Sequence, residues 1–61
     1  MDKNERVQFA QEMLDTATCS LREYIAVNPG EGKRDYCYAI LEMNNVEIDK
    51  RLVNEMCKIL S

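Results

Sequence analysis

The chain has 61 residues and a net charge of −3, from 11 acidic and 8 basic residues. It has no histidine, the usual residue for acid–base catalysis near neutral pH and the usual partner of a nucleophilic thiol, so we expect no enzyme and no catalytic residue. Its surplus of acids disfavours nucleic-acid binding, and no apolar run approaches the ~20 residues that cross a bilayer, so neither nucleic acid nor a membrane is an expected partner.

The first predicted element is a helical arm over about residues 3–27. Met13 and Ile25 widen its apolar stripe, as in a helix of a globular bundle. Asp2 or Asn4 is placed to cap its start, and it should end just before the only proline. The stripe itself follows alternating steps of three and four, the spacing of one buried helix face, and consists of Val7, Ala10, Leu14, Ala17, Leu21 and Tyr24.

A hinge follows at residues 28–32, with the sequence NPGEG. It holds the only proline and both glycines of the chain. Proline ends the helix before it, and glycine adopts backbone conformations that other residues avoid. The sequence therefore predicts two helical arms joined by one flexible turn.

The second arm covers about residues 33–60. Its weak point is Asn44-Asn45, because asparagine is a poor helix former, and Asn44 with Glu47 fits a capping box. This arm is therefore either one kinked helix or two short helices. Its apolar face, which Lys50 interrupts, consists of Tyr36, Ala39, Met43, Val46, Val53, Cys57 and Leu60, broadened by Ile40, Leu52, Met56 and Ile59.

The expected fold is a single all-α domain over residues 1–61, an antiparallel helical hairpin with a third helix if the second arm splits. Two amphipathic arms alone leave much of their apolar stripes in water. Pairing two hairpins into a helical bundle hides those stripes. We therefore expect a homodimer or a higher oligomer.

The three cysteines, Cys19, Cys37 and Cys57, are odd in number and far apart, and they form no CxxC pair. Nothing at the N-terminus resembles a signal peptide, so we expect reduced thiols and a cytoplasmic protein. Without histidine these thiols make a poor zinc set, and no metal or other cofactor is expected. Cys37 and Cys57 are expected to behave as small core residues, whereas Cys19 lies off the apolar stripe.

Lys33 and Arg34 form a candidate anion-binding site at the start of the second arm. A helix N-terminus attracts anions, and arginine binds phosphate through two parallel hydrogen bonds. A phosphate-bearing ligand or an acidic partner would suit this position. The alternative is that both side chains form surface ion pairs with Glu31, Asp35 or Glu23.

Two tyrosines complete the candidate site, Tyr36 and Tyr38. Either ring is suited to stack on a nucleotide base. Tyr36 has an alternative role, because it faces Tyr24 across the hinge and the two rings are expected to pack together. Tyr38 lies off the main apolar track and is the better candidate for contact with a ligand or partner.

The run Arg34-Asp35, then Ala39, then Leu41-Glu42 resembles the small phage-encoded helical-hairpin proteins that sequester cyclic nucleotides. In that family an Arg-Glu pair near a helix start precedes an alanine and a Leu-Glu-Glu-Ala-type segment. The resemblance covers about a quarter of the chain, and Asp35 stands in place of the glutamate. It implies an oligomeric nucleotide sponge that uses Lys33, Arg34 and a tyrosine.

The leading expectation for function is a non-enzymatic interaction protein that binds a protein partner stoichiometrically, through an acidic helix face or the hinge. Such a protein would act as a regulator or as a phage-type inhibitor of a host or defence protein. The alternative is the nucleotide sponge. A third reading, nucleic-acid binding through Lys50 and Arg51, rests on two bases only.

Overall fold

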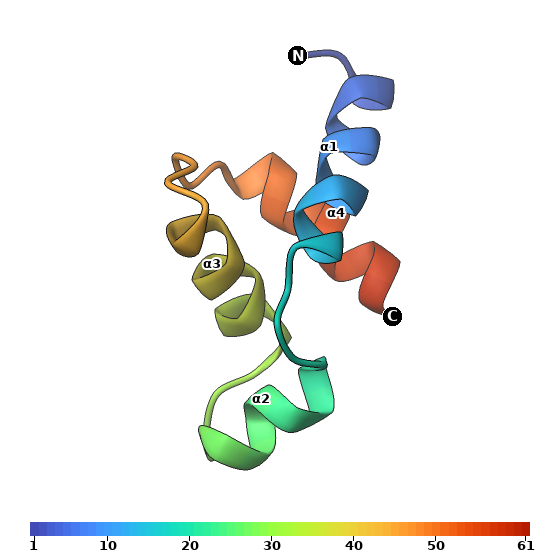
Figure 1. The fold of residues 1–61 in the computed structure, drawn as a ribbon. Coiled ribbons are helices and arrows are strands. Elements are labelled where there is room, and N and C mark those ends of the chain that lie inside the picture. The colour runs from blue at the N-terminus through green and yellow to red at the C-terminus, as the bar shows by residue number, and fades with distance from the viewer.

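The computed structural model describes all 61 residues and contains four helices and no strand (Figure 1). The predicted all-α class is therefore confirmed. Both predicted arms are split into two helices each. The elements in chain order are α1 (Lys3–Asp15), α2 (Leu21–Val27), α3 (Lys33–Met43) and α4 (Lys50–Leu60).

The first arm is broken in its middle, so the prediction of one continuous helix over residues 3–27 is wrong. Thr16 ends α1, and its hydroxyl donates a hydrogen bond to the Met13 carbonyl oxygen over 2.6 Å. Ser20 then starts α2, because its hydroxyl oxygen accepts the Glu23 amide proton over 3.1 Å. The Glu23 carboxylate accepts from the Ser20 amide in return, which completes a capping box.

The hinge lies where the sequence places it. Asn28 ends α2, and Gly30 has a φ of 95°, a left-handed conformation that glycine adopts without steric cost. The amide of Gly32 donates to the Asp35 carboxylate over 2.9 Å and so begins α3. Residues 28–32 therefore form the turn that joins the end of α2 to the start of α3.

The second arm is split at the predicted weak point, and the second of the two alternatives, two short helices, is observed. Asn44 ends α3 rather than capping a following helix, so the predicted capping box with Glu47 is wrong. Its side-chain amide donates to the Ile40 carbonyl oxygen over 2.8 Å, and Asn45 takes the left-handed conformation with a φ of 56°. The next helix begins only after Asp49, which caps α4.

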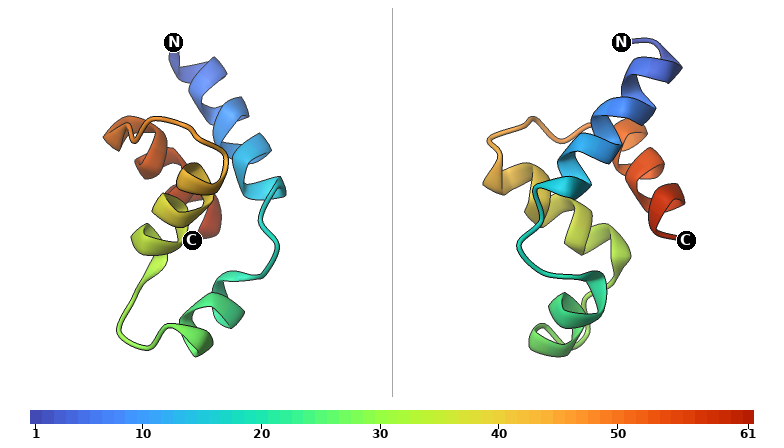
Figure 2. Two further views of the ribbon diagram at one scale, coloured as in Figure 1. Left: turned by 60° about the vertical axis from the view of Figure 1, so that its left-hand side comes forward. Right: turned by 45° about the vertical axis from the view of Figure 1, so that its right-hand side comes forward.

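The core lies where α1, α3 and α4 meet. α1 packs most extensively on α4, α3 packs on both, and α2 contacts α3 alone, projecting from the other three helices (Figure 2). Met43 and Ile25, expected on buried faces, are 68% and 38% exposed, because breaks in the helices change which residues face inward. The buried cluster consists of Ala10, Tyr36, Cys37, Ile40, Leu41, Leu52, Val53 and Met56.

One chain hides most of its apolar stripes by folding on itself. Its accessible surface is 4293 Å², close to the about 4,100 Å² expected for a compact monomer of 7.1 kDa. Burial of the stripes therefore does not by itself require a second copy, and the oligomer stays a prediction. None of the four helices is both long enough and apolar enough to span a membrane.

Candidate functional site

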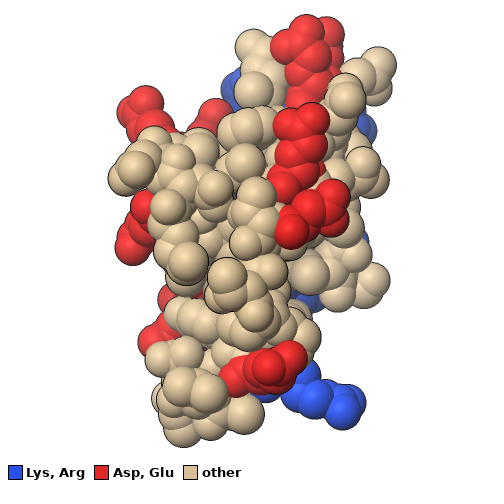
Figure 3. All heavy atoms as spheres, in the orientation of Figure 1, with Lys and Arg blue, Asp and Glu red and all other residues tan.

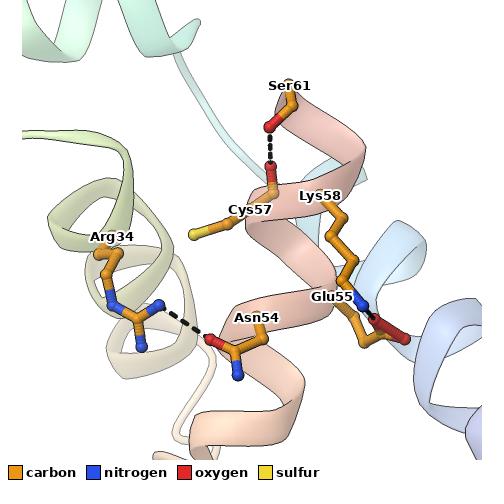
Figure 4. A network of polar contacts seen from close by, with 6 residues as sticks. All are labelled: Arg34, Asn54, Glu55, Cys57, Lys58 and Ser61. Carbon is orange, nitrogen blue, oxygen red and sulfur yellow. Dashed lines mark hydrogen bonds and ion pairs between the residues drawn. The ribbon is translucent and has the colours of Figure 1, made fainter.

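Lys33 and Arg34 begin α3, and both side chains reach across to α4. The Lys33 ammonium donates to the Ser61 hydroxyl over 2.9 Å. The Arg34 guanidinium donates to the Asn54 side-chain oxygen, also over 2.9 Å (Figure 4). Neither cation makes the surface ion pair that was the alternative for it. The one salt bridge of the molecule joins Lys58 to Glu55 over 3.1 Å. Both cations are therefore bound to neutral oxygen atoms and keep their charge available.

The helix N-terminus beside these cations already carries an anion. The Gly32 amide donates to the Asp35 carboxylate, which belongs to the first turn of α3. Tyr38 lies beside Arg34, and its phenolic oxygen raises the pKa of Arg34 by accepting from the guanidinium. The structure thus brings Arg34 and Tyr38 together. The Asp35 carboxylate, however, already occupies the Gly32 amide that an external phosphate would bind.

Tyr36 lies apart from this group. Its side chain is only 5% exposed, and its hydroxyl donates to the Cys19 carbonyl oxygen over 2.5 Å. Its ring packs on Tyr24 with centroids 5.4 Å apart and planes tilted by 59°, so the predicted contact between these rings is confirmed. Burial raises the pKa of Tyr36. A ring enclosed in this way is not free to stack on a nucleotide.

An apolar pocket that sequence reasoning missed lies between α3 and the segment of residues 16–19. Its volume is about 60 Å³, several times the roughly 10–15 Å³ that one water needs. Seven of its ten lining residues are hydrophobic. The lining includes Ala17, Cys19, Tyr24, Tyr36, Ala39 and Met43.

Two hydrogen bonds hold the pocket open by fixing both ends of one wall. The Asn44 side-chain amide donates to the Thr16 hydroxyl over 2.9 Å, which ties the end of α1 to the end of α3. The hydroxyl of Tyr36 binds the Cys19 carbonyl oxygen at the other end. The wall is therefore anchored to α3 on either side of the recess, and the recess is part of the folded state.

The surroundings of the pocket combine exposed apolar atoms with acidic groups. Met43 stands at the edge, 68% exposed. Figure 3 shows an uncharged middle to this face, with acidic side chains along α1 on one side and further acidic groups at the opposite edge. On α1 the exposed acids are Glu5, Glu12 and Asp15. The recess is thus an apolar patch within a negative surface.

The sequence signal that marks the break in the first arm, beside which this pocket lies, is the run Ser20-x-x-Glu23. It is the pattern of a capping box and marks a helix start, so it separates Ala17 from Leu21 on the predicted continuous stripe. With the arm broken there, the segment before Ser20 becomes a wall rather than a helix face. Side chains predicted for a bundle seam then line a surface recess.

No group of three or more histidine, cysteine, aspartate or glutamate residues comes together in a way that would hold a metal ion. Comparison with protein-family models, curated proteins and solved structures finds no match to this chain.

Proposed function

We propose that this is a small, non-enzymatic helical interaction protein that binds a protein partner stoichiometrically. An apolar side chain of the partner enters the pocket between α3 and residues 16–19. The observation that supports this most directly is the open apolar recess with the exposed Met43 at its edge. Apolar recesses of this kind receive the anchor side chains that dominate protein interfaces.

The charge around the pocket favours a partner with basic side chains beside its apolar anchor. The chain carries a net charge of −3, and exposed acids on α1 border the same face. Complementary charge across an interface speeds association and selects among partners. This mode of action fits a regulator, or a phage-type inhibitor of a host or defence protein.

The test compares two exposed apolar residues, only one of which lines the pocket. The tagged wild-type chain and its Met43→Glu and Val27→Glu variants are used to capture proteins from cell lysate, and affinity for a recovered partner is then measured by calorimetry. Because burial of one methionine side chain is worth about 1.5–3 kcal/mol, Met43→Glu should weaken binding roughly tenfold to hundredfold. Val27, 79% exposed and outside the pocket, should tolerate the same change.

Two results would contradict the proposal. One is equal binding by Met43→Glu and the wild-type chain. The other is capture of nothing except further copies of the protein itself. A circular dichroism spectrum of each variant shows whether the helices are intact, so that a loss of binding is attributed to the pocket.

A second candidate function is capture of a phosphate-bearing nucleotide by Lys33 and Arg34. The observation in its favour is that neither cation is paired with a carboxylate. Calorimetry with a panel of linear and cyclic mononucleotides tests it, and a Lys33→Ala/Arg34→Ala double variant should abolish any heat of binding. Absence of heat with the wild-type chain, or binding that survives in the double variant, eliminates this candidate.

A further inference from the structure

Two of the three cysteines, distant in the sequence, meet where α3 packs on α4. Cys37 lies in the second turn of α3 and is fully buried, and Cys57 lies in the last turn of α4 and is partly exposed. Their sulfur atoms are 3.9 Å apart. Two thiols that lie 20 residues apart in the sequence are thus neighbours in the fold. The remaining thiol, Cys19, lines the apolar pocket instead.

The surrounding contacts keep the two thiols together. Lys33 binds Ser61 and Arg34 binds Asn54, so both side chains join α3 to the end of the chain and to α4. The Ser61 hydroxyl in turn donates to the Cys57 carbonyl oxygen over 2.9 Å (Figure 4). A disulfide requires sulfur atoms about 2.05 Å apart, so the two must approach by about 2 Å. Cys57 stands three residues before the end of α4, and helix ends adjust readily.

We propose that Cys37 and Cys57 are a site of reversible oxidation, at which a peroxide converts the two thiols into an intramolecular disulfide that joins α3 to α4. The structure assigns the first step to Cys57, because its thiol is partly exposed while that of Cys37 has no exposed surface. The oxidant is hydrogen peroxide or an organic hydroperoxide.

The chemistry balances in two steps. The Cys57 thiolate attacks one peroxide oxygen, the O–O bond breaks, and the departing hydroxide or alkoxide takes up a proton, which leaves a sulfenic acid on Cys57. The Cys37 thiolate then attacks the Cys57 sulfur, the S–S bond forms, and the S–O bond breaks with loss of hydroxide, which becomes water. With hydrogen peroxide, two thiols and one peroxide give one disulfide and two waters. A dithiol reductant reverses the oxidation.

The electrostatics of the pair support this order. Burial raises the pKa of Cys37, and the neighbouring Cys57 thiol raises it further, so the buried thiol is a poor first nucleophile. Arg34 and Lys33 act in the opposite direction and lower the pKa of Cys37. Both cations stay beside Cys37 after Cys57 has been oxidised, so they favour the Cys37 thiolate in the second step.

The decisive experiment maps the bond in the wild-type chain. Trypsin places the three cysteines on different peptides, residues 7–22, 35–50 and 52–58. The reduced protein is treated with hydrogen peroxide, its remaining thiols are alkylated, and the digest is analysed by mass spectrometry. We expect residues 35–50 linked to 52–58, loss of two hydrogen atoms from the intact mass, and alkylation of Cys19 alone. The thermal midpoint should rise by roughly 10 °C and return with dithiothreitol.

Variants distinguish a specific pair from general thiol reactivity. Cys19→Ser should form the same disulfide at the wild-type rate. Cys57→Ser should leave Cys37 unreactive toward peroxide, whereas Cys37→Ser should stop at a sulfenic acid on Cys57, detected by a dimedone adduct. Three results with the wild-type chain would each overturn the proposal: a disulfide that includes Cys19, an intermolecular dimer as the main product, or three free thiols after treatment. These results do not depend on whether a variant folds.

Discussion

The side chain of Tyr24 connects α2, the projecting helix, to α3 and to the hinge. Tyr24 on α2 packs on Tyr36, and its hydroxyl donates to the carboxylate of Glu31 in the hinge. This hydrogen bond, together with burial and the negative charge of Glu31, raises the pKa of Tyr24 to about 12. Because the folded-state pKa lies above the ordinary value of 10, the contact contributes stability that is full below pH 10 and is lost as pH rises towards 12.

Removal of the acceptor should therefore change the titration of this tyrosine. In Glu31→Ala the hydrogen bond and the nearby charge are gone, so the pKa of Tyr24 should fall towards 10. Near pH 11, about one unit above the ordinary value, Tyr24 should be mostly protonated in the wild-type chain and mostly ionised in the variant. Carbon NMR of the ring reports each tyrosine separately. Glu12→Ala, at an exposed position on α1, serves as the control, and a wild-type Tyr24 that titrates at its ordinary value would refute the assignment.

At the scale of the elements, the sequence predicts helix type and the hinge well, but predicts helix ends less well. Apolar periodicity identifies residues such as Ala10, Val53 and Met56, which do form the core. It also continues without interruption through Thr16–Ser20, where the backbone leaves the helix. Periodicity measures the burial of faces and is insensitive to a short break, whereas capping chemistry marks the break. The Ser20 and Glu23 side chains carried that information locally.

The candidate site was predictable only in part, for a related reason. Lys33 and Arg34 lie at a helix start as expected, since local sequence determines that position. Their partners Ser61 and Asn54 lie 28 and 20 residues away, and only the packing of α3 on α4 brings them near. The apolar pocket and the thiol pair depend on the same tertiary contacts, so no local pattern predicts either.

At the scale of the whole molecule, the net negative charge has opposite effects on self-association and on partner binding. Two copies, each with a net charge of −3, repel one another, whereas a basic partner is attracted. We expect reversible dimers that form through the face around Met43, become more abundant at high concentration and are strengthened by salt. Binding to the partner should instead weaken as salt is raised.

Sedimentation velocity over a range of protein and salt concentrations measures the self-association. Met43→Glu should shift the protein towards monomer, and Val27→Glu should behave as the wild-type chain does. A monomer at every concentration would refute the predicted oligomer. A dimer that persists in the low micromolar range, regardless of salt, would instead make a second copy the natural occupant of the pocket.

The projection of α2 has a practical consequence. This helix has no buried residue and contacts only α3. The turn that follows it contains Gly30, and the space beside Gly30 is open: a Cβ atom built there has no other atom within 4 Å, apart from those of the adjoining residues. A foreign peptide spliced in at Gly30 would extend into solvent and leave the eight core residues in place. The protein therefore offers a miniature scaffold for peptide display, with its insertion point set by the fold.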